Sequence, residues 1–101
     1  MKNTYKLVWS EEALRNLKGI IEYLEKRWTN REIKKFAQLL DKQLELIREN
    51  PFLFATSEKS NELRRSVLSR QTTLYYRIKD CEVQIITLFD NRQNPNKLKN
   101  K

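Results

Sequence analysis

Hydrophobic and polar residues alternate with a period of two at the start of the chain and again in its second half. Near the N-terminus, Tyr5, Leu7 and Trp9 alternate with the residues between them, which predicts a first strand. Three further runs, 61–69, 72–79 and 82–89, have the composition of strands. A tight turn at Asp80-Cys81 would join the last two runs. The pattern therefore predicts one N-terminal strand and three C-terminal strands.

The chain between these strands has the period of α-helices. Ser10 can cap a first helix over Glu11–Trp28, and Thr29 with Glu32 has the spacing of a capping box for a second helix. Asn50-Pro51 would end that second helix, because the residue before a proline avoids helical geometry. The apolar stripes are Leu14, Leu17, Ile21, Leu24 and Trp28 in the first helix, and Ile33, Phe36, Ala37, Leu40, Leu44 and Ile47 in the second.

These elements give the order β-α-α-β-β-β and an α+β fold. We expect an N-terminal strand, an antiparallel two-helix hairpin and a three-strand antiparallel meander that completes one small sheet. With 101 residues, the chain fits a single domain over 1–101. Residues 96–101 are expected to form a flexible basic tail.

The last predicted strand has apolar side chains on both sides. Strict alternation places Val83, Ile85 and Phe89 on one side and Ile86 and Leu88 on the other. Neither side is clearly a solvent face. This strand should therefore be central in the sheet, or a segment of a partner should cover its second side.

Composition narrows the possible functions. The chain carries 21 Lys and Arg against 13 Asp and Glu, a formal charge of +8, which favours a polyanionic or acidic partner but also fits a basic protein charged for solubility. The single cysteine, Cys81, cannot form an internal disulfide, and the absence of histidine removes the usual zinc ligands, so we expect no metal and no cofactor. No signal peptide or membrane-spanning stretch is apparent, which predicts a cytoplasmic protein with no membrane contact.

The strand region and the segment that follows it contain five arginines: Arg64, Arg65, Arg70, Arg77 and Arg92. Arginine can hold phosphates and carboxylates through two parallel hydrogen bonds, but any one of these residues could equally be solvated or ion-paired. Alternation puts Arg64 and Arg65 on opposite faces, so both cannot serve one site.

Cleavage of RNA by the 2′-hydroxyl group needs a base and an acid beside a group that holds the charged phosphorane. Without histidine, the base and the acid would have to come from Glu62, Tyr75, Tyr76 or Lys79 with large pKa shifts. We therefore predict no catalytic residues, although the residue pattern leaves the enzymatic reading open.

The order of elements, together with "LRRSVL", "LYYRIKDCEVQIITL" and "DNRQNP", resembles the RelE/ParE superfamily of bacterial toxins from toxin–antitoxin pairs. RelE-like members cleave messenger RNA on the ribosome, whereas ParE-like members inhibit DNA gyrase. Ribonuclease members have an arginine just before the aromatic strand and a Tyr or His near the C-terminus. Here the first position falls near Thr73, and no Tyr or His follows Tyr76.

The resemblance therefore implies a ParE-like toxin that binds DNA gyrase, with Arg64, Arg77 and Arg92 as target contacts. It also implies a cognate antitoxin, for which Tyr75, Ile86 and Leu88 are the candidate contacts. Two alternatives stay open. One is a RelE-like endoribonuclease that acts on messenger RNA at the ribosome, and the other is a non-toxic basic binding module with the same fold.

Overall fold

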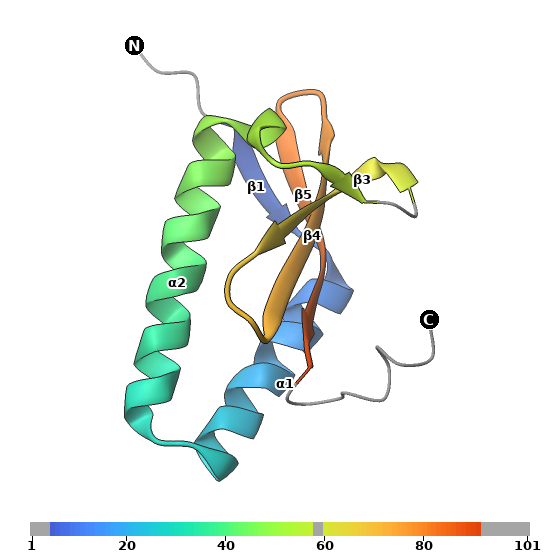
Figure 1. The fold of residues 1–101 in the computed structure, drawn as a ribbon. Helices are drawn as coiled ribbons and strands as arrows, with labels where there is room; N and C mark the ends of the chain where they lie inside the picture. The colour runs from blue at the N-terminus through green and yellow to red at the C-terminus, as the bar shows by residue number, and fades with distance from the viewer. Residues whose placement is uncertain (1–4, 58–59, 92–101) are drawn as a thin grey trace.

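The computed structural model describes residues 5–57 and 60–91, which form one mixed sheet and two long helices (Figure 1). The elements in chain order are β1 (Lys6–Trp9), α1 (Glu11–Arg27), α2 (Asn30–Glu49), the 3-10 helix η1 (Pro51–Leu53), β2 (Thr56–Ser57), β3 (Ser60–Val67), β4 (Thr72–Lys79) and β5 (Glu82–Asp90). The predicted tail, 96–101, lies outside the described residues.

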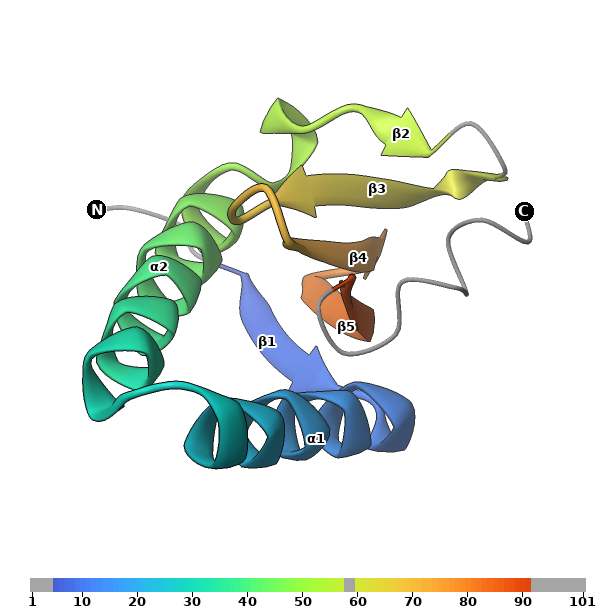
Figure 2. The same ribbon diagram turned by 60° about the horizontal axis from the view of Figure 1, so that its bottom comes forward.

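The strand order in the sheet is β1-β5-β4-β3-β2. Strands β3, β4 and β5 form the antiparallel meander, and β1 adds to β5 in parallel, as Figure 2 lets the reader follow. The predicted fold class and the central position of the last strand are confirmed. Two short elements, η1 and β2, were not predicted. Both lie in the connection between α2 and β3, where no periodic pattern is long enough to reveal them.

The helices begin and end within one residue of the predicted positions. The Ser10 hydroxyl accepts a hydrogen bond from the Ala13 N–H at 2.9 Å, and Asn50 follows the last residue of α2 as its C-cap. The predicted capping box of α2 is wrong, because the Thr29 side chain makes no capping hydrogen bond. Instead, the Thr29 carbonyl accepts the N–H groups of Glu32 and Ile33, which closes the first turn after a two-residue connection.

The buried face of helix α1 is rotated from the predicted one, although Leu24 is buried as predicted and Leu17 and Ile21 pack against the core. Its buried residues are Ala13, Ile20 and Leu24, whereas Leu14 and Trp28 are 51% and 44% exposed. The buried stripe is therefore rotated toward Ala13 and away from Leu14. Trp28 has already left the helix as its C-cap.

One core lies between the two helices and one face of the sheet. Its buried side chains come from both helices, from β4 and β5, and from Leu68, which follows β3: Ala13, Ile20, Leu24, Phe36, Leu40, Ile47, Leu68, Leu74, Tyr76, Val83, Ile85 and Leu88. No helix within residues 5–57 and 60–91 combines the length and apolar character that crossing a membrane requires.

A β-bulge in β5 changes the predicted alternation. Tyr76 pairs with Ile85 and Tyr75 pairs with Thr87, so Ile86 is an extra residue between the two pairs. The bulge turns Leu88 onto the core side, where it is 4% exposed. The prediction that Ile86 and Leu88 share one face is therefore wrong, and Leu88 is not available as a surface contact for a partner in this conformation.

Helix α1 covers the part of β5 that extends beyond β1. Strand β1 pairs only with Glu82 to Ile85, and the next backbone groups of β5 bond to α1 and its cap. The Ser10 hydroxyl donates to the Ile86 carbonyl at 2.7 Å, and Asn16 Oδ1 accepts the Leu88 N–H at 3.1 Å. Two polar side chains thus replace a neighbouring strand at this edge.

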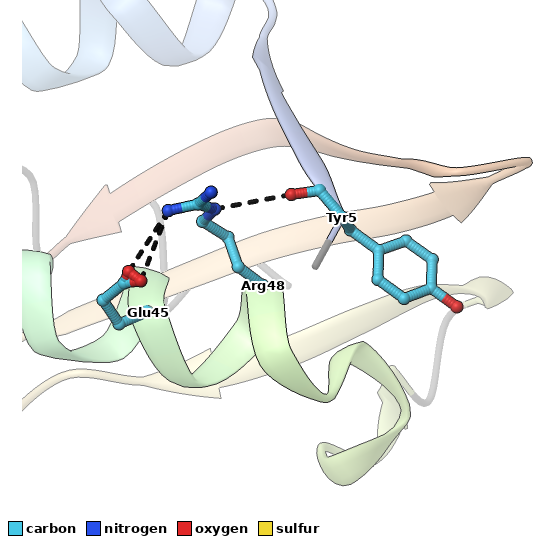
Figure 3. Close-up of polar contacts among 3 residues, drawn as sticks. All are labelled: Tyr5, Glu45 and Arg48. Carbon is cyan, nitrogen blue, oxygen red and sulfur yellow. Dashed lines mark hydrogen bonds and ion pairs between the residues drawn. The ribbon is translucent and has the colours of Figure 1, made fainter. Parts of the chain in front are cut away.

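Arg48 ties the start of the first strand to the end of α2 (Figure 3). The Tyr5 N–H donates to the Arg48 carbonyl at 3.1 Å, and Arg48 Nε donates back to the Tyr5 carbonyl at 3.4 Å. Glu45 lies one turn earlier and holds the same guanidinium group at 3.2 Å. The exchange satisfies a carbonyl at the C-terminal end of the helix and aligns β1 with the sheet.

We expect Asn16→Ala to lower the free energy of unfolding by about 1–3 kcal/mol, because the Leu88 N–H loses its partner beneath the helix. Urea denaturation would measure the change. Lys18→Ala, an exposed substitution in the same helix, is the control and should stay within about 0.5 kcal/mol of wild type. Equal stabilities of the Asn16 and Lys18 variants would contradict the role assigned to Asn16.

Candidate functional site

A surface pocket of about 460 Å³ lies between η1, β3 and the end of β4. Its lining residues are Phe52, Glu62, Arg64, Arg77, Ile78 and Lys79. The set contains three cationic side chains, one carboxylate and two apolar side chains. The pocket thus brings together two of the three arginines predicted as target contacts, Arg64 and Arg77.

The pocket exists because β3 and β4 diverge. Their pairing runs from Val67 opposite Thr73 to Arg64 opposite Tyr76 and ends there. The next pairs in this register would be Leu63 with Arg77 and then Glu62 with Ile78, and three of these four residues, Glu62, Arg77 and Ile78, line the pocket instead. The side chains of Tyr76 and Arg64 are on one face of the sheet, and alternation places the Arg77 side chain on the other face. Both arginines still reach the pocket, because the pocket opens between β3 and β4.

Arg64 is held by the segment that follows α2. Its Nη1 donates to the Phe54 carbonyl at 2.6 Å, and its guanidinium carbon lies 5.2 Å from the centroid of the Phe52 ring. Phe54 packs against the core, whereas Phe52 is 58% exposed. The aromatic face and the carbonyl fix the position of the guanidinium group without neutralising its charge.

Tyr76 fixes the segment that holds Arg64. Its side chain is fully buried, and its hydroxyl donates to the Pro51 carbonyl at 2.5 Å. Burial raises the pKa of Tyr76 from 10.0 to about 12, while the positive charge of Arg64 acts in the opposite direction. The hydroxyl is therefore a protonated donor at neutral pH, which makes Tyr76 unsuited to act as a general base.

Arg77 is held from the other side of the pocket. Its Nε donates to Gln84 Oε1 at 2.6 Å, directly across the β4–β5 pairing. The amide group of Gln84 in turn donates to Glu82 Oε1 at 3.4 Å. Gln84 thus orients the guanidinium group. In this series of hydrogen bonds the Glu82 carboxylate contacts Gln84, and Gln84 separates it from Arg77.

The arrangement suits the binding of an anionic group. Among residues 5–57 and 60–91, no ion pair neutralises Arg64 or Arg77. Two fixed guanidinium groups with Lys79 can hold a carboxylate or a phosphate. Glu62 adds a carboxylate at the same opening, so the lining charges sum to +2 from three cations and one anion.

The other predicted site residues lie apart from this pocket. Arg65 pairs with Tyr75 on the opposite face from Arg64, as alternation predicted. Tyr75 and Ile86 are half-buried and outside the core cluster, whereas Leu88 belongs to the core. Arg92 lies outside the described residues.

Sequence reasoning missed three residues that support the site: Phe52, Phe54 and Gln84. Phe52 and Phe54 follow a proline that ends a helix, and only the tertiary structure brings them to Arg64. Gln84 could have been found, because a two-residue turn at Asp80-Cys81 fixes Arg77 opposite Gln84.

Comparisons with known proteins agree with this fold. The model of a family described as "ParE toxin of type II toxin-antitoxin system, parDE" matches residues 7–95. A sequence comparison with curated proteins gives no match.

Solved structures of several toxins are similar to this chain. A chain of the chromosomal ParDE TA system from P. aeruginosa is 21% identical, with a TM-score of 0.72 over 88% of this chain and 98% of that one. The YoeB/ParE toxin from Agrobacterium tumefaciens is 12% identical, with a TM-score of 0.62 over 84% and 96%. A chain of the E. coli DinJ-YafQ toxin-antitoxin complex is 11% identical, with a TM-score of 0.61 over 90% and 97%. At identities this low, the structural similarity shows a shared fold and nothing further.

We expect Tyr76→Phe to be less stable than wild type by about 1–2 kcal/mol at pH 8, because the buried Pro51 carbonyl loses its donor. The pKa of Tyr76 is about 12 in the folded state and 10.0 in the unfolded state. Its protonated hydroxyl therefore contributes fully to stability below pH 10, and this contribution is lost as the pH rises from 10 through about 12. The gap between the two proteins should therefore narrow by about 1 kcal/mol between pH 8 and pH 11. Urea denaturation of both proteins at each pH would show it, and a gap that stays constant would argue against a buried, protonated hydroxyl.

Proposed function

The chain belongs to the family of ParE toxins of type II toxin–antitoxin systems, and from this premise we propose that it inhibits DNA gyrase in the cytoplasm and breaks no covalent bond itself. The match to the ParE family over residues 7–95 is the observation that carries the proposal. A cognate antitoxin, the other component of such a system, neutralises it. No cofactor or metal takes part in this proposal.

The geometry of the pocket supports binding in preference to cleavage. Arg64 and Arg77 are held by a carbonyl, an aromatic ring and an amide group, all of which leave their charges available to a target. The tyrosine nearest to Arg64 has a raised pKa and donates its proton to a backbone carbonyl. We therefore assign Arg64 and Arg77 as target contacts, and Arg92 remains a candidate on the basis of the sequence.

The side of the sheet that the helices leave uncovered is the candidate surface for the antitoxin. Tyr75 and Ile86 are half-buried outside the core cluster and remain the candidate contacts. Leu88 no longer belongs to this set, because the bulge in β5 turns it into the core.

A second candidate function is cleavage of messenger RNA on the ribosome. It is favoured by one observation: the pocket places the Glu62 carboxylate in the same opening as Arg64, Arg77 and Lys79. A carboxylate can act as the base and a guanidinium group can hold the charged phosphorane. Tyr76 would take no part in the proton transfers.

To separate the two functions, purified toxin without antitoxin would be added in parallel to a gyrase supercoiling assay and to a translating extract with primer extension of messenger RNA. We expect loss of supercoiling with intact messenger. Replacing both Arg64 and Arg77 with glutamine should raise the inhibitory concentration at least about tenfold, the effect of losing one charge-assisted hydrogen bond. The double variant Arg15→Gln/Lys18→Gln, which also removes two positive charges but from exposed sites on α1, is the control and should stay within about twofold.

New messenger ends with normal supercoiling would overturn the gyrase proposal in favour of the ribonuclease, and Glu62→Gln should then abolish those ends. Normal supercoiling and intact messenger together would favour a binding module without toxicity.

A further inference from the structure

Positive charge gathers where the two long helices meet. Residues 26–35 span the last turn of α1, the two-residue connection and the first turns of α2. This segment, the hairpin tip, contains one carboxylate, Glu32, and five exposed cations: Lys26, Arg27, Arg31, Lys34 and Lys35. Its net charge is therefore +4, half of the formal charge of the whole chain in a tenth of its length.

The protein itself does not neutralise these charges. In the part of the chain that the structure describes, no ion pair includes any of the five cations. Arg27 lies over the ring of Tyr23, with its guanidinium carbon 5.8 Å from the ring centroid, and this contact leaves its charge in place. The cations of the tip thus remain available to an anion from outside the chain.

The cations in α2 oppose the stability of their own helix. Arg31 lies in the first turn of α2, where the positive end of the helix dipole disfavours a cation. Lys34 and Lys35 follow three and four positions later, so the three like charges are neighbours on the helix surface and repel one another. Lys26 and Arg27, by contrast, lie at the end of α1 that favours cations. Helix stability therefore accounts for the cations of α1 but not for those of α2.

A membrane surface fits the tip poorly. Binding of a helix at a bilayer surface grows with the apolar area that it buries there. The apolar sides of α1 and α2 face the core, where Leu24 and Phe36 are buried. Among the described residues 26–35, Trp28 is the one large apolar side chain with high exposure, 44%. One such side chain offers little apolar area to a bilayer.

A nucleic acid fits the spread of charge better than a protein does. The cations are distributed over two helices and are mostly lysines, which hold phosphates as point charges. A nucleic acid carries a phosphate at every nucleotide, so it can meet several separated cations at once. A protein would need an equally dense cluster of carboxylates.

We propose that the hairpin tip binds DNA through its backbone phosphates, without reading the base sequence. The inference deepens the proposed function, on which it rests for the choice of DNA, because gyrase holds DNA as its substrate. The tip and η1, which borders the pocket, lie at opposite ends of α2, about 30 Å apart for a helix of 20 residues (Figure 1). One toxin can therefore contact gyrase through Arg64 and Arg77 while its tip contacts the DNA that gyrase holds.

The test is an NMR titration of the ¹⁵N-labelled full-length protein with a DNA duplex of about twelve base pairs, between 50 and 200 mM salt. The Trp28 indole N–H and the Lys34 amide report on the tip, and the Arg77 amide reports on the pocket. We expect saturable shifts at the tip. The logarithm of the binding constant should fall with the logarithm of the salt concentration, with a slope of about −3 to −4.5 for about three to five phosphate contacts.

Paired variants then assign the binding to the tip. Lys34→Gln/Lys35→Gln should weaken DNA binding at least about tenfold and make the salt slope shallower by about 2. The control, Lys18→Gln/Lys42→Gln, removes two exposed lysines of the same helices away from the tip and should stay within about threefold. In urea denaturation the tip variant should be at least as stable as the control, because repulsion from Arg31 is relieved.

Several results would overturn the inference. Two rival probes are a blocked hexaglutamate peptide and vesicles of phosphatidylglycerol, and either one could bind the tip at a lower concentration than the duplex. DNA could shift the Arg77 amide and leave the tip unchanged, or the two double variants could weaken binding equally. A tip variant less stable than the control would show that Lys34 and Lys35 serve the fold.

The titration and the gyrase assay can fail separately. DNA binding at the tip without loss of supercoiling would retain this inference and overturn only the proposed target. Loss of supercoiling without DNA binding at the tip would overturn this inference and retain the target.

Discussion

The hydrogen bond from the Tyr76 hydroxyl to the Pro51 carbonyl is the contact on which the candidate site depends. Tyr76 is fully buried at the centre of the sheet, and a buried hydroxyl needs an acceptor. The carbonyl that it finds belongs to the first residue of η1, the short helix that follows α2. This bond therefore sets where η1 lies against the sheet. The next residues of the segment, Phe52 and Phe54, then supply the ring and the carbonyl that hold Arg64.

The second half of the site has an independent support. Arg77 is oriented by Gln84 across the β4–β5 hairpin, and the two-residue turn at Asp80-Cys81 sets that register. Asp80 adopts a φ of 56°, a conformation that aspartate tolerates better than most residues, which keeps the turn tight. The pocket thus lies between a rigid hairpin and a segment anchored by one buried hydroxyl. A partner that enters it meets two guanidinium groups positioned in advance, so it loses little of its binding energy in ordering them.

The sequence predicted the positions of the helices and strands better than it predicted which of their faces are buried. Ser10, the Asn50-Pro51 stop and the hairpin turn are local signals, and each appears in the structure where the pattern placed it. The bulge at Ile86 could not be predicted from alternation, and the Ser10 and Asn16 contacts beside it form only in the tertiary structure. For the site, alternation separated Arg64 from Arg65 correctly. Alternation could not predict that Arg64 and Arg77 line one pocket. Both reach the pocket only because β3 and β4 diverge, and the hydrophobic pattern of a sequence does not reveal where paired strands diverge.

The most direct test of this dependence is the side-chain NMR resonance of Arg64 Nε–Hε in wild type and in Tyr76→Phe. If the tyrosine hydroxyl positions η1, its removal should release Phe52 from the guanidinium group and move the Arg64 resonance toward that of an arginine far from any aromatic ring. The Arg77 resonance should stay in place, because Gln84 holds it separately. A folded Tyr76→Phe variant with an unchanged Arg64 resonance would contradict the account.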